Sequence, residues 1–336
     1  MSPETLGWGI IGAGDIADRI TAPAMRAARG SRLLAVFRRD RQRAEEFAAR
    51  HGAARAYDRV EDLLADPEVG AVYVATPVAR HRPDTLAAAA ARKHVLCEKP
   101  LALGVAEATA MRDACARAGV ALMTCFYQRF NARHRKVKEL LAEGAVGRAT
   151  LVRMNFSGRY PDRPGAWRQD PDVAGGGSYM DNASHCVDLL RYLFGGVTEV
   201  AAFTDTLAAR YAVEDTASSL LRLRGGAHAV VTSCWSTGDP DEARNSMLEI
   251  HGTEGVILSA PLHDKFSRGT LRVVTAARDE SFTFEASTHV ALLEEFAAAV
   301  REGRAPAVTG DDGIAALRIV EAVYESSRAR RVVTLE

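Results

Sequence analysis

Short apolar runs recur through the first 125 residues, and segments with helical periodicity separate them. Each run is only as long as a strand and holds few polar residues, which is typical of strands buried on both faces. Strands and helices that alternate in this way predict a doubly wound parallel sheet of the α/β class. The expected strands are residues 6–11, 33–37, 53–57, 71–75, 95–97 and 121–125.

The pattern changes near residue 149, where apolar and polar residues begin to alternate. Such alternation is typical of strands with one buried and one exposed face, and glycine-containing turns such as Gly225-Gly226 join neighbouring strands. We therefore expect a large, mainly antiparallel open sheet, whose uncovered face favours a subunit interface where it is apolar. The expected strands are residues 150–157, 198–207, 216–223, 227–235, 246–251 and 271–276.

This change of pattern predicts two domains, residues 1–125 and 126–336, with the boundary close to Cys125. A chain of 336 residues is long enough for two domains that each have a core. Its 43 Lys and Arg balance 43 Asp and Glu, so no net charge draws it toward nucleic acid or an anionic membrane. A small-molecule partner is therefore expected.

The five cysteines are scattered and form no Cys-x-x-Cys pair. This argues against a structural zinc site and suits reduced thiols. The first residues lack the pattern of a secretory signal, and no apolar segment approaches the length of a membrane span. Together these features predict a cytoplasmic protein that uses no metal.

A glycine-rich turn lies between the first expected strand and the first helix, and it follows the pattern G-x-G-x-x-A. Gly12 would make the tight turn, Gly14 would let a pyrophosphate approach the backbone, and Ala17 would let the helix pack close to the strand. The free N–H groups of the helix N-terminus would face the phosphates. The turn therefore predicts dinucleotide binding. The expected contacts are Gly12, Ala13, Gly14, Asp15 and Ile16.

The second expected strand ends in Arg38, Arg39 and Asp40, with Arg43 close behind. At this distance from the glycines, an acidic side chain would bind the ribose hydroxyls of NAD, whereas an arginine would pair with the extra phosphate of NADP. Because Arg38 occupies that position, with Arg39 and Arg43 near it, NADP is favoured. The alternatives are that Asp40 binds the ribose, or that these arginines only solvate a loop.

The strand at residues 95–97 ends directly on Glu98, Lys99 and Pro100. In open α/β sheets, ligands bind beyond the carboxyl ends of parallel strands, so Lys99 is a candidate site residue. A lone lysine before a proline is more often part of a solvated loop.

A second glycine segment, at residues 175–177, precedes a predicted helix that carries Asp181 and His185. Helical spacing places these two side chains on one face, one turn apart, where a carboxylate can raise the basicity of an imidazole. The alternative is an Asp-His pair that only stabilises the helix. Asp188, one further turn along, is expected to be a structural partner or a surface group.

Three separated motifs agree: G-x-G-x-x-A at Gly12, E-K-P at Glu98, and GGG-x3-D-x3-H ending at His185. Together they resemble the Gfo/Idh/MocA family of oxidoreductases. The resemblance covers essentially the whole chain, including Thr76-Pro77-x3-His81 and the Arg129-Phe130 pair.

The resemblance implies a Rossmann cofactor domain followed by an α/β substrate domain, whose large open sheet commonly forms homo-dimers or homo-tetramers. It implies hydride transfer between a nicotinamide cofactor and a carbon that bears oxygen, usually on a sugar, cyclitol or related polyol. Lys99 would bond the reacting oxygen, His185 would be the general acid/base, and Asp181 would orient both substrate and His185.

Further contacts follow by the same match of motifs. The cofactor would also contact Thr76, Pro77, His81, Glu98, Lys99, Trp167 and Arg168. The substrate would contact Lys99, Arg129, Trp167, Asp181 and His185. Tyr160 is a further expected contact, because side chains of the loop at residues 160–170 could hydrogen-bond a polyhydroxylated ring.

Within the family, the Trp167-Arg168 pair just before the glycines is similar to that of NADPH-linked reductases of keto-sugars such as 1,5-anhydrofructose. Two other functions remain open. One is an NAD-linked cyclitol or dihydrodiol dehydrogenase. The other is a non-catalytic nucleotide-binding regulator on the same scaffold.

Overall fold

A computed structural model describes residues 5–238 and 246–335. The chain forms two compact units. The first contains Met1–Phe126 and His289–Ile314, and the second contains Tyr127–Thr288 and Ala315–Glu336. The sequence predicted one boundary, close to residue 125. In the structure, residues 289–314 also belong to the first unit.

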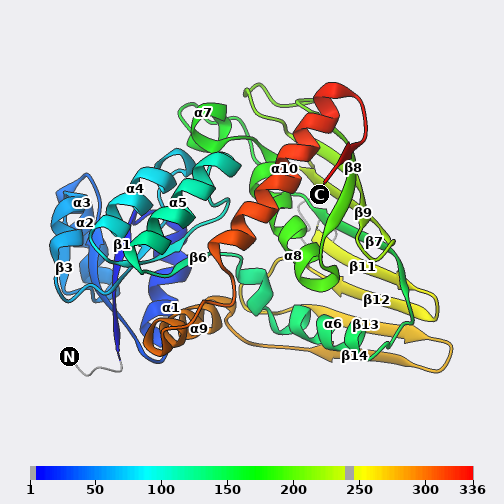
Figure 1. The fold of residues 1–336 in the computed structure, drawn as a ribbon, viewed down its shortest axis with the longest axis horizontal. Helices are drawn as coiled ribbons and strands as arrows, with labels where there is room; N and C mark the ends of the chain where they lie inside the picture. Colours follow the sequence, from blue (N-terminus) through cyan, green and yellow to red (C-terminus); the bar gives the residue numbers. More distant parts are fainter. Residues whose placement is uncertain (1–4, 239–245, 336) are drawn as a thin grey trace. The chain divides into compact units, whose positions relative to one another are not determined.

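The first unit is built on a parallel sheet with the strand order β3-β2-β1-β4-β5-β6 (Figure 1). This confirms the predicted doubly wound sheet. Its central strands are buried on both faces, as their unbroken apolar sequence indicates, and β4 has no exposed position. The strands are β1 Leu6–Ile11, β2 Ser31–Phe37, β3 Arg55–Tyr57, β4 Ala71–Val74, β5 His94–Cys97 and β6 Leu122–Thr124.

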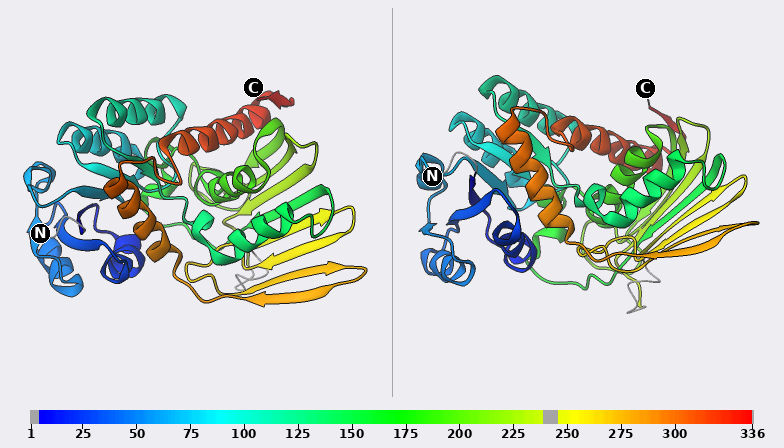
Figure 2. Two further views of the ribbon diagram at one scale, coloured as in Figure 1. Left: turned by 60° about the horizontal axis from the view of Figure 1, so that its bottom comes forward. Right: turned by 90° about the horizontal axis from the view of Figure 1, so that it is seen from below.

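Helices cover both faces of this sheet; Figure 2 shows α4 and α5 on one side and α1 and α9 on the other. The returning helix α9 packs on β1, where the rings of Trp8 and Phe296 lie 5.3 Å apart. The spacing of residues along the sequence gave no sign of this contact. The helices are α1 Ala22–Ala27, α2 Arg41–His51, α3 Val60–Ala65, α4 Val78–Ala90, α5 Val105–Ala118 and α9 Thr288–Glu302, and a π-helical turn, η1 Ala17–Thr21, precedes α1.

The second unit contains a nine-stranded sheet with the order β14-β13-β12-β11-β7-β10-β9-β8-β15. Among the strands that the structure describes here, only the β7–β10 pair is parallel, so the predicted mainly antiparallel sheet is confirmed. The strands are β7 Ala149–Phe156, β8 Val197–Asp205, β9 Thr216–Leu223, β10 His228–Cys234, β11 Ser246–Gly252, β12 Gly255–Ala260, β13 Thr270–Thr275, β14 Asp279–Thr283 and β15 Val333–Thr334.

Helices α6, α8 and the C-terminal part of α10 lie on one face of this sheet (Figure 2). The strands alternate accordingly, and in β9 Leu221 is fully buried while its neighbour Leu220 is 49% exposed. No helix among the described residues is long and apolar enough to cross a membrane. The remaining elements are η2 Tyr127–Phe130, α6 Ala132–Ala142, η3 Trp167–Gln169, α7 Pro171–Ala174, η4 Tyr179–Ala183, α8 Ser184–Phe194 and α10 Gly310–Ala329.

Candidate functional site

The glycine turn follows β1 directly and leads into η1. Gly12 has φ +91, and a Cβ at this position would lie 2.7 Å from the amide nitrogen of Thr76. Gly14 is exposed, and the nearest atom to a Cβ there would be 4.0 Å away. Ala13 and Ala17 are buried, whereas Asp15 is exposed and Ile16 is half-buried. The backbone at Gly14 is therefore open to a ligand, as a pyrophosphate-binding turn requires.

The arginines after β2 differ in what they contact. Asp40 accepts the backbone N–H of Arg43 at 3.0 Å as the N-cap of α2, and its carboxylate lies 3.5 Å from the Arg43 guanidinium. Within residues 5–238 and 246–335, neither Arg38 nor Arg39 forms an ion pair. Asp40 is thus occupied in capping a helix, while two guanidinium groups at the end of β2 are available to an anion.

Thr76 and His81 hold the turn after β4. Thr76 donates its hydroxyl to Asp84 at 2.9 Å. His81 is 1% exposed, and its two ring nitrogens lie 2.9 Å and 3.0 Å from the carbonyl oxygens of Thr76 and Pro100. Burial lowers the pKa of His81. The imidazole thus joins the turn after β4 to the turn after β5, and the predicted cofactor contacts of Thr76, Pro77 and His81 stay predictions.

Glu98 and Lys99 come directly after β5, and the Lys99-Pro100 peptide bond is cis. Glu98 accepts hydrogen bonds from the Tyr73 hydroxyl and, at 3.2 Å, from the backbone N–H of Lys99. Tyr73 is fully buried and in turn accepts the Thr21 hydroxyl at 3.1 Å. Tyr73 was missed from the sequence, although a tyrosine within an aliphatic buried strand needs a partner for its hydroxyl.

Asp181 and His185 lie in the second unit, at a change of helix type. Asp181 belongs to the π-helical turn η4, and His185 lies in the first turn of α8. The sequence predicted a regular helix here, whereas the structure has one wide turn of the kind that often marks functional sites. The His185 ring lies 4.9 Å from that of Tyr127 and 6.0 Å from that of Phe156.

Arg168 adds a cation beside Asp181. Its Nε lies 3.3 Å from Asp181 Oδ2, and its guanidinium stacks 4.3 Å from the centre of the Trp167 ring. Both side chains of this ion pair are partly exposed. The structure therefore brings the Trp167-Arg168 pair together with Asp181, which the sequence predicted from a different motif.

Arg129 and Tyr160 have partners within the second unit. The Arg129 guanidinium bonds Asp188 through two contacts of 2.9 Å and 2.6 Å, and Asp188 is fully buried. Asp188 is thus a structural partner of Arg129 and not a surface group, which were the two alternatives predicted from the sequence. Tyr160 packs its ring 4.7 Å from that of Trp235. Substrate contacts of Arg129 and Tyr160 stay predictions.

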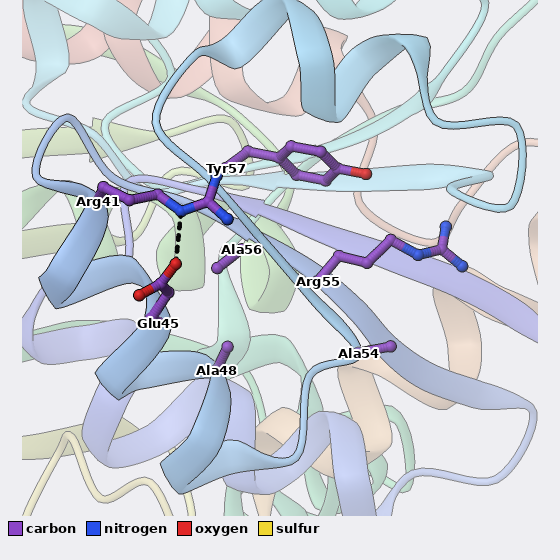
Figure 3. A pocket seen from close by; sticks show the side chains of 7 residues that line it. All are labelled: Arg41, Glu45, Ala48, Ala54, Arg55, Ala56 and Tyr57. Carbon is purple, nitrogen blue, oxygen red and sulfur yellow. Dashed lines mark hydrogen bonds and ion pairs between the residues drawn. The ribbon is translucent and has the colours of Figure 1, made fainter.

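The predicted residues fall into two groups. The glycine turn, the arginines after β2 and Lys99 belong to the first unit, whereas Trp167, Arg168, Asp181 and His185 belong to the second. A separate hollow of about 460 Å³ lies beside α2 and β3 (Figure 3). It contains none of the predicted site residues, and its two arginines are paired, Arg41 with Glu45 at 2.7 Å and Arg55 with Asp66 at 2.6 Å. Among the described residues, no cluster of His, Cys, Asp or Glu could hold a metal ion.

A doubly wound sheet with an open glycine turn beyond β1 defines a nucleotide-binding protein of the Rossmann class. Comparison with known families agrees. The model of the "Oxidoreductase family, NAD-binding Rossmann fold" matches residues 6–126, and that of the "GFO/IDH/MocA C-terminal domain" matches residues 134–258. The chain therefore belongs to the Gfo/Idh/MocA family of oxidoreductases, which confirms the resemblance of its motifs.

Similar proteins span its full length. The 1,5-anhydro-D-fructose reductase of Ensifer adhaerens is 31% identical, over 98% of each chain. The aldose-aldose oxidoreductase of Caulobacter crescentus, solved with glycerol, is 32% identical with a TM-score of 0.91, covering 98% of this chain and 100% of that one. A levoglucosan dehydrogenase solved with NADH is 26% identical with a TM-score of 0.88, covering 99% of each chain.

Proposed function

We propose that this oxidoreductase transfers hydride between NADP(H) and a carbon of a sugar, keto-sugar or polyol. The observation that carries the proposal is the exposed backbone at Gly14, directly after β1 and before η1, in a chain that also carries Glu98-Lys99 beyond β5. The relatives support the substrate class, because the names of all three describe enzymes that act on sugars or their derivatives.

The residues of the first unit fit a nicotinamide dinucleotide. The open backbone at Gly14 would receive the pyrophosphate, since no side chain of the described residues lies within 4 Å of a Cβ at that position. Arg38 and Arg39 would pair with the additional phosphate of NADP. When bound, the cofactor supplies the donor or acceptor of hydride.

The proton chemistry is assigned to three side chains. Oxidation of an alcohol requires a proton to leave oxygen while hydride leaves carbon, and His185 is proposed to take that proton because an imidazole titrates near neutral pH. The Lys99 ammonium would stabilise the negative charge that develops on the same oxygen. Asp181 would orient the substrate and His185. In the reducing direction the same groups act in reverse.

Arg168 refines the role of Asp181. The Arg168 guanidinium lies 3.3 Å from the Asp181 carboxylate, and a carboxylate can only accept hydrogen bonds. Asp181 is therefore proposed to accept a substrate hydroxyl, and Arg168 to fix the direction in which the carboxylate points.

Turnover by purified variants tests these assignments. A panel of sugars, keto-sugars and cyclitols is screened by the absorbance of the reduced nicotinamide, with NADPH and with NADH. Lys99→Met and His185→Ala should each lower kcat by about 10²- to 10⁴-fold while NADPH still binds. Lys138→Met is the matched control, because Lys138 is an exposed lysine of α6. Wild-type turnover in both site variants would refute the assignment.

The same panel decides between the other two functions. An NAD-linked cyclitol or dihydrodiol dehydrogenase would prefer NADH and turn over a cyclic diol. A regulator would bind the cofactor and turn over nothing. Arg38→Asp should move the preference from NADPH toward NADH, and an unchanged preference would refute the proposed role of Arg38.

We also propose that the protein forms homo-dimers or homo-tetramers through the open face of the nine-stranded sheet. Phe203 and Leu220 are 72% and 49% exposed there, and the β8–β9 register places both on that face. Exposed apolar groups of this size favour an interface. Light scattering should show a dimer or tetramer, and the double change Phe203→Lys with Leu220→Lys should give a monomer. Phe266→Lys is the control, and a monomeric wild type would refute the proposal.

A further inference from the structure

In the second unit, the Glu214 carboxylate binds the backbone of the residues that precede Asp181 in the sequence. Three consecutive backbone N–H groups bond to Glu214. Gly177 donates to its Oε2 at 2.7 Å, Tyr179 donates to its Oε1 at 2.8 Å, and Ser178 donates to its backbone carbonyl at 3.0 Å. These are N–H groups at the start of a helix, which have no partners within the helix itself, so a negative charge stabilises them.

A second helix secures this carboxylate. The Tyr324 hydroxyl of α10 donates to Glu214 Oε1 at 2.9 Å, and Tyr324 also touches the glycine segment, since a Cβ on Gly176 would overlap its hydroxyl. A Cβ on Gly177 would overlap the Glu214 carbonyl oxygen. Glu214 is 9% exposed. Burial raises its pKa, and the two backbone bonds and the tyrosine oppose that shift.

We propose that Glu214, supported by Tyr324, is a positioning residue that sets where Asp181 and His185 stand. The connection is short, because the Gly177 carbonyl accepts the Asp181 N–H at 2.9 Å. A shift of Gly177 is thereby passed to Asp181 and, four residues further along the helix, to His185. The proposal rests on the catalytic roles given above to these two residues.

The hydrogen bonds that the Glu214 carboxylate accepts can be tested with a conservative substitution. Glu214→Gln keeps the size of the side chain but replaces one acceptor oxygen by an NH₂ donor. Either the Gly177 or the Tyr179 N–H then faces a donor, so the segment has to move. Tyr324→Phe removes one bond from the carboxylate and leaves both backbone bonds in place. Glu214→Gln should therefore have the larger effect.

The control lies on the same helix as Tyr324. Ser326→Ala removes a buried hydroxyl that accepts the Ala202 N–H at 3.1 Å and donates to the Arg331 carbonyl at 2.6 Å, so its side-chain hydrogen bonds among the described residues lie outside the glycine segment. It should lower the thermal stability and leave kcat unchanged. If Glu214 only stabilises the fold, Glu214→Gln should likewise lower the thermal stability and leave kcat unchanged.

Kinetics separate the two roles. A displacement of about 1 Å at reacting groups can cost about 10²-fold in rate, so Glu214→Gln should lower kcat by about 10- to 100-fold. The dissociation constant of NADPH should change much less than kcat, because the glycine turn and the arginines proposed to bind its phosphates belong to the first unit. A variant that is less stable but turns over at the wild-type kcat would overturn the proposal.

A second readout does not depend on turnover. The imidazole resonances of His185, assigned by comparison with His185→Ala, should shift in Glu214→Gln and keep their wild-type positions in Ser326→Ala. Unmoved His185 resonances in Glu214→Gln would overturn the proposal. If the wild type turns over no substrate, the proposed function fails, and these resonances alone decide whether Glu214 positions His185.

Discussion

The two glycine segments of this protein each come just before a π-helical turn, but glycine is needed in them for different reasons. Gly12 and Gly14 precede η1, and residues 175–177 precede η4, so each segment leads into a π-helical turn. Among the described residues, the atom nearest to a Cβ at Gly14 is 4.0 Å away, whereas a Cβ at Gly176 or Gly177 would overlap Tyr324 or Glu214 of the second unit.

The difference separates two uses of a missing side chain. At Gly14 the absence of a Cβ leaves room for a ligand. At Gly177 it lets two backbone segments of the protein approach each other. Substitution by alanine should therefore affect ligand binding in the first case, and folding together with the placement of Asp181 in the second.

The largest effect is expected for Gly177→Ala. Its Cβ would overlap a backbone carbonyl, which cannot move aside as a side chain can. We expect a loss of about 3 kcal/mol in the free energy of unfolding and a large fall in kcat. Urea unfolding and steady-state kinetics measure both quantities. A stable and fully active Gly177→Ala would show that the close approach to Glu214 is unimportant.

Gly12→Ala should come next. A Cβ there would lie 2.7 Å from the Thr76 nitrogen, and φ +91 is unfavourable for alanine. The left-handed backbone alone costs about 1–2 kcal/mol. Both stability and NADPH affinity should fall, because the turn itself is deformed. Retained affinity, measured by calorimetry, would contradict this use of Gly12.

Gly14→Ala should weaken binding without any loss of stability. The methyl group fits within the protein, but it occupies space that we assign to the pyrophosphate. We expect the dissociation constant of NADPH to rise about tenfold, which corresponds to about 1.4 kcal/mol. An unchanged dissociation constant would show that the open backbone at Gly14 does not face the cofactor.

The smallest effect on function is expected for Gly52→Ala, the control for this series. Gly52 caps the end of α2 with φ +70, and a Cβ there would meet no atom within 4 Å. Its replacement should cost about 1 kcal/mol of stability through backbone strain and leave kcat and NADPH affinity unchanged. A fall in kcat in Gly52→Ala would show that the loss of activity in the other glycine variants results from their lower stability alone.

The first glycine turn could be predicted from the sequence because its causes are local. The apolar strand, the glycines and the small Ala17 lie within 12 residues of one another, and each has a separate physical reason. The two sheets were predictable for a similar reason, since unbroken and alternating apolar patterns distinguish strands with two buried faces from strands with one.

The support of the second glycine segment was not predictable, because its causes are distant. Glu214 is 37 residues from Gly177, and Tyr324 is 110 residues from Glu214. Nothing in the spacing of these residues indicates that they meet. The same holds for the packing of Phe296 on Trp8 and for the two π-helical turns, which tertiary contacts and not local patterns determine.

Deuterium transfer tests the central claim most directly. NADPH labelled with deuterium at the transferable position of C4 of the nicotinamide ring is incubated with the enzyme and each keto-sugar of the panel, and the product is analysed by mass spectrometry. We predict that a product gains one deuterium with the wild type and with Lys138→Met, and that Lys99→Met and His185→Ala give none in the same time. If no substrate acquires the label from the wild-type enzyme, the protein does not perform the hydride transfer proposed for it.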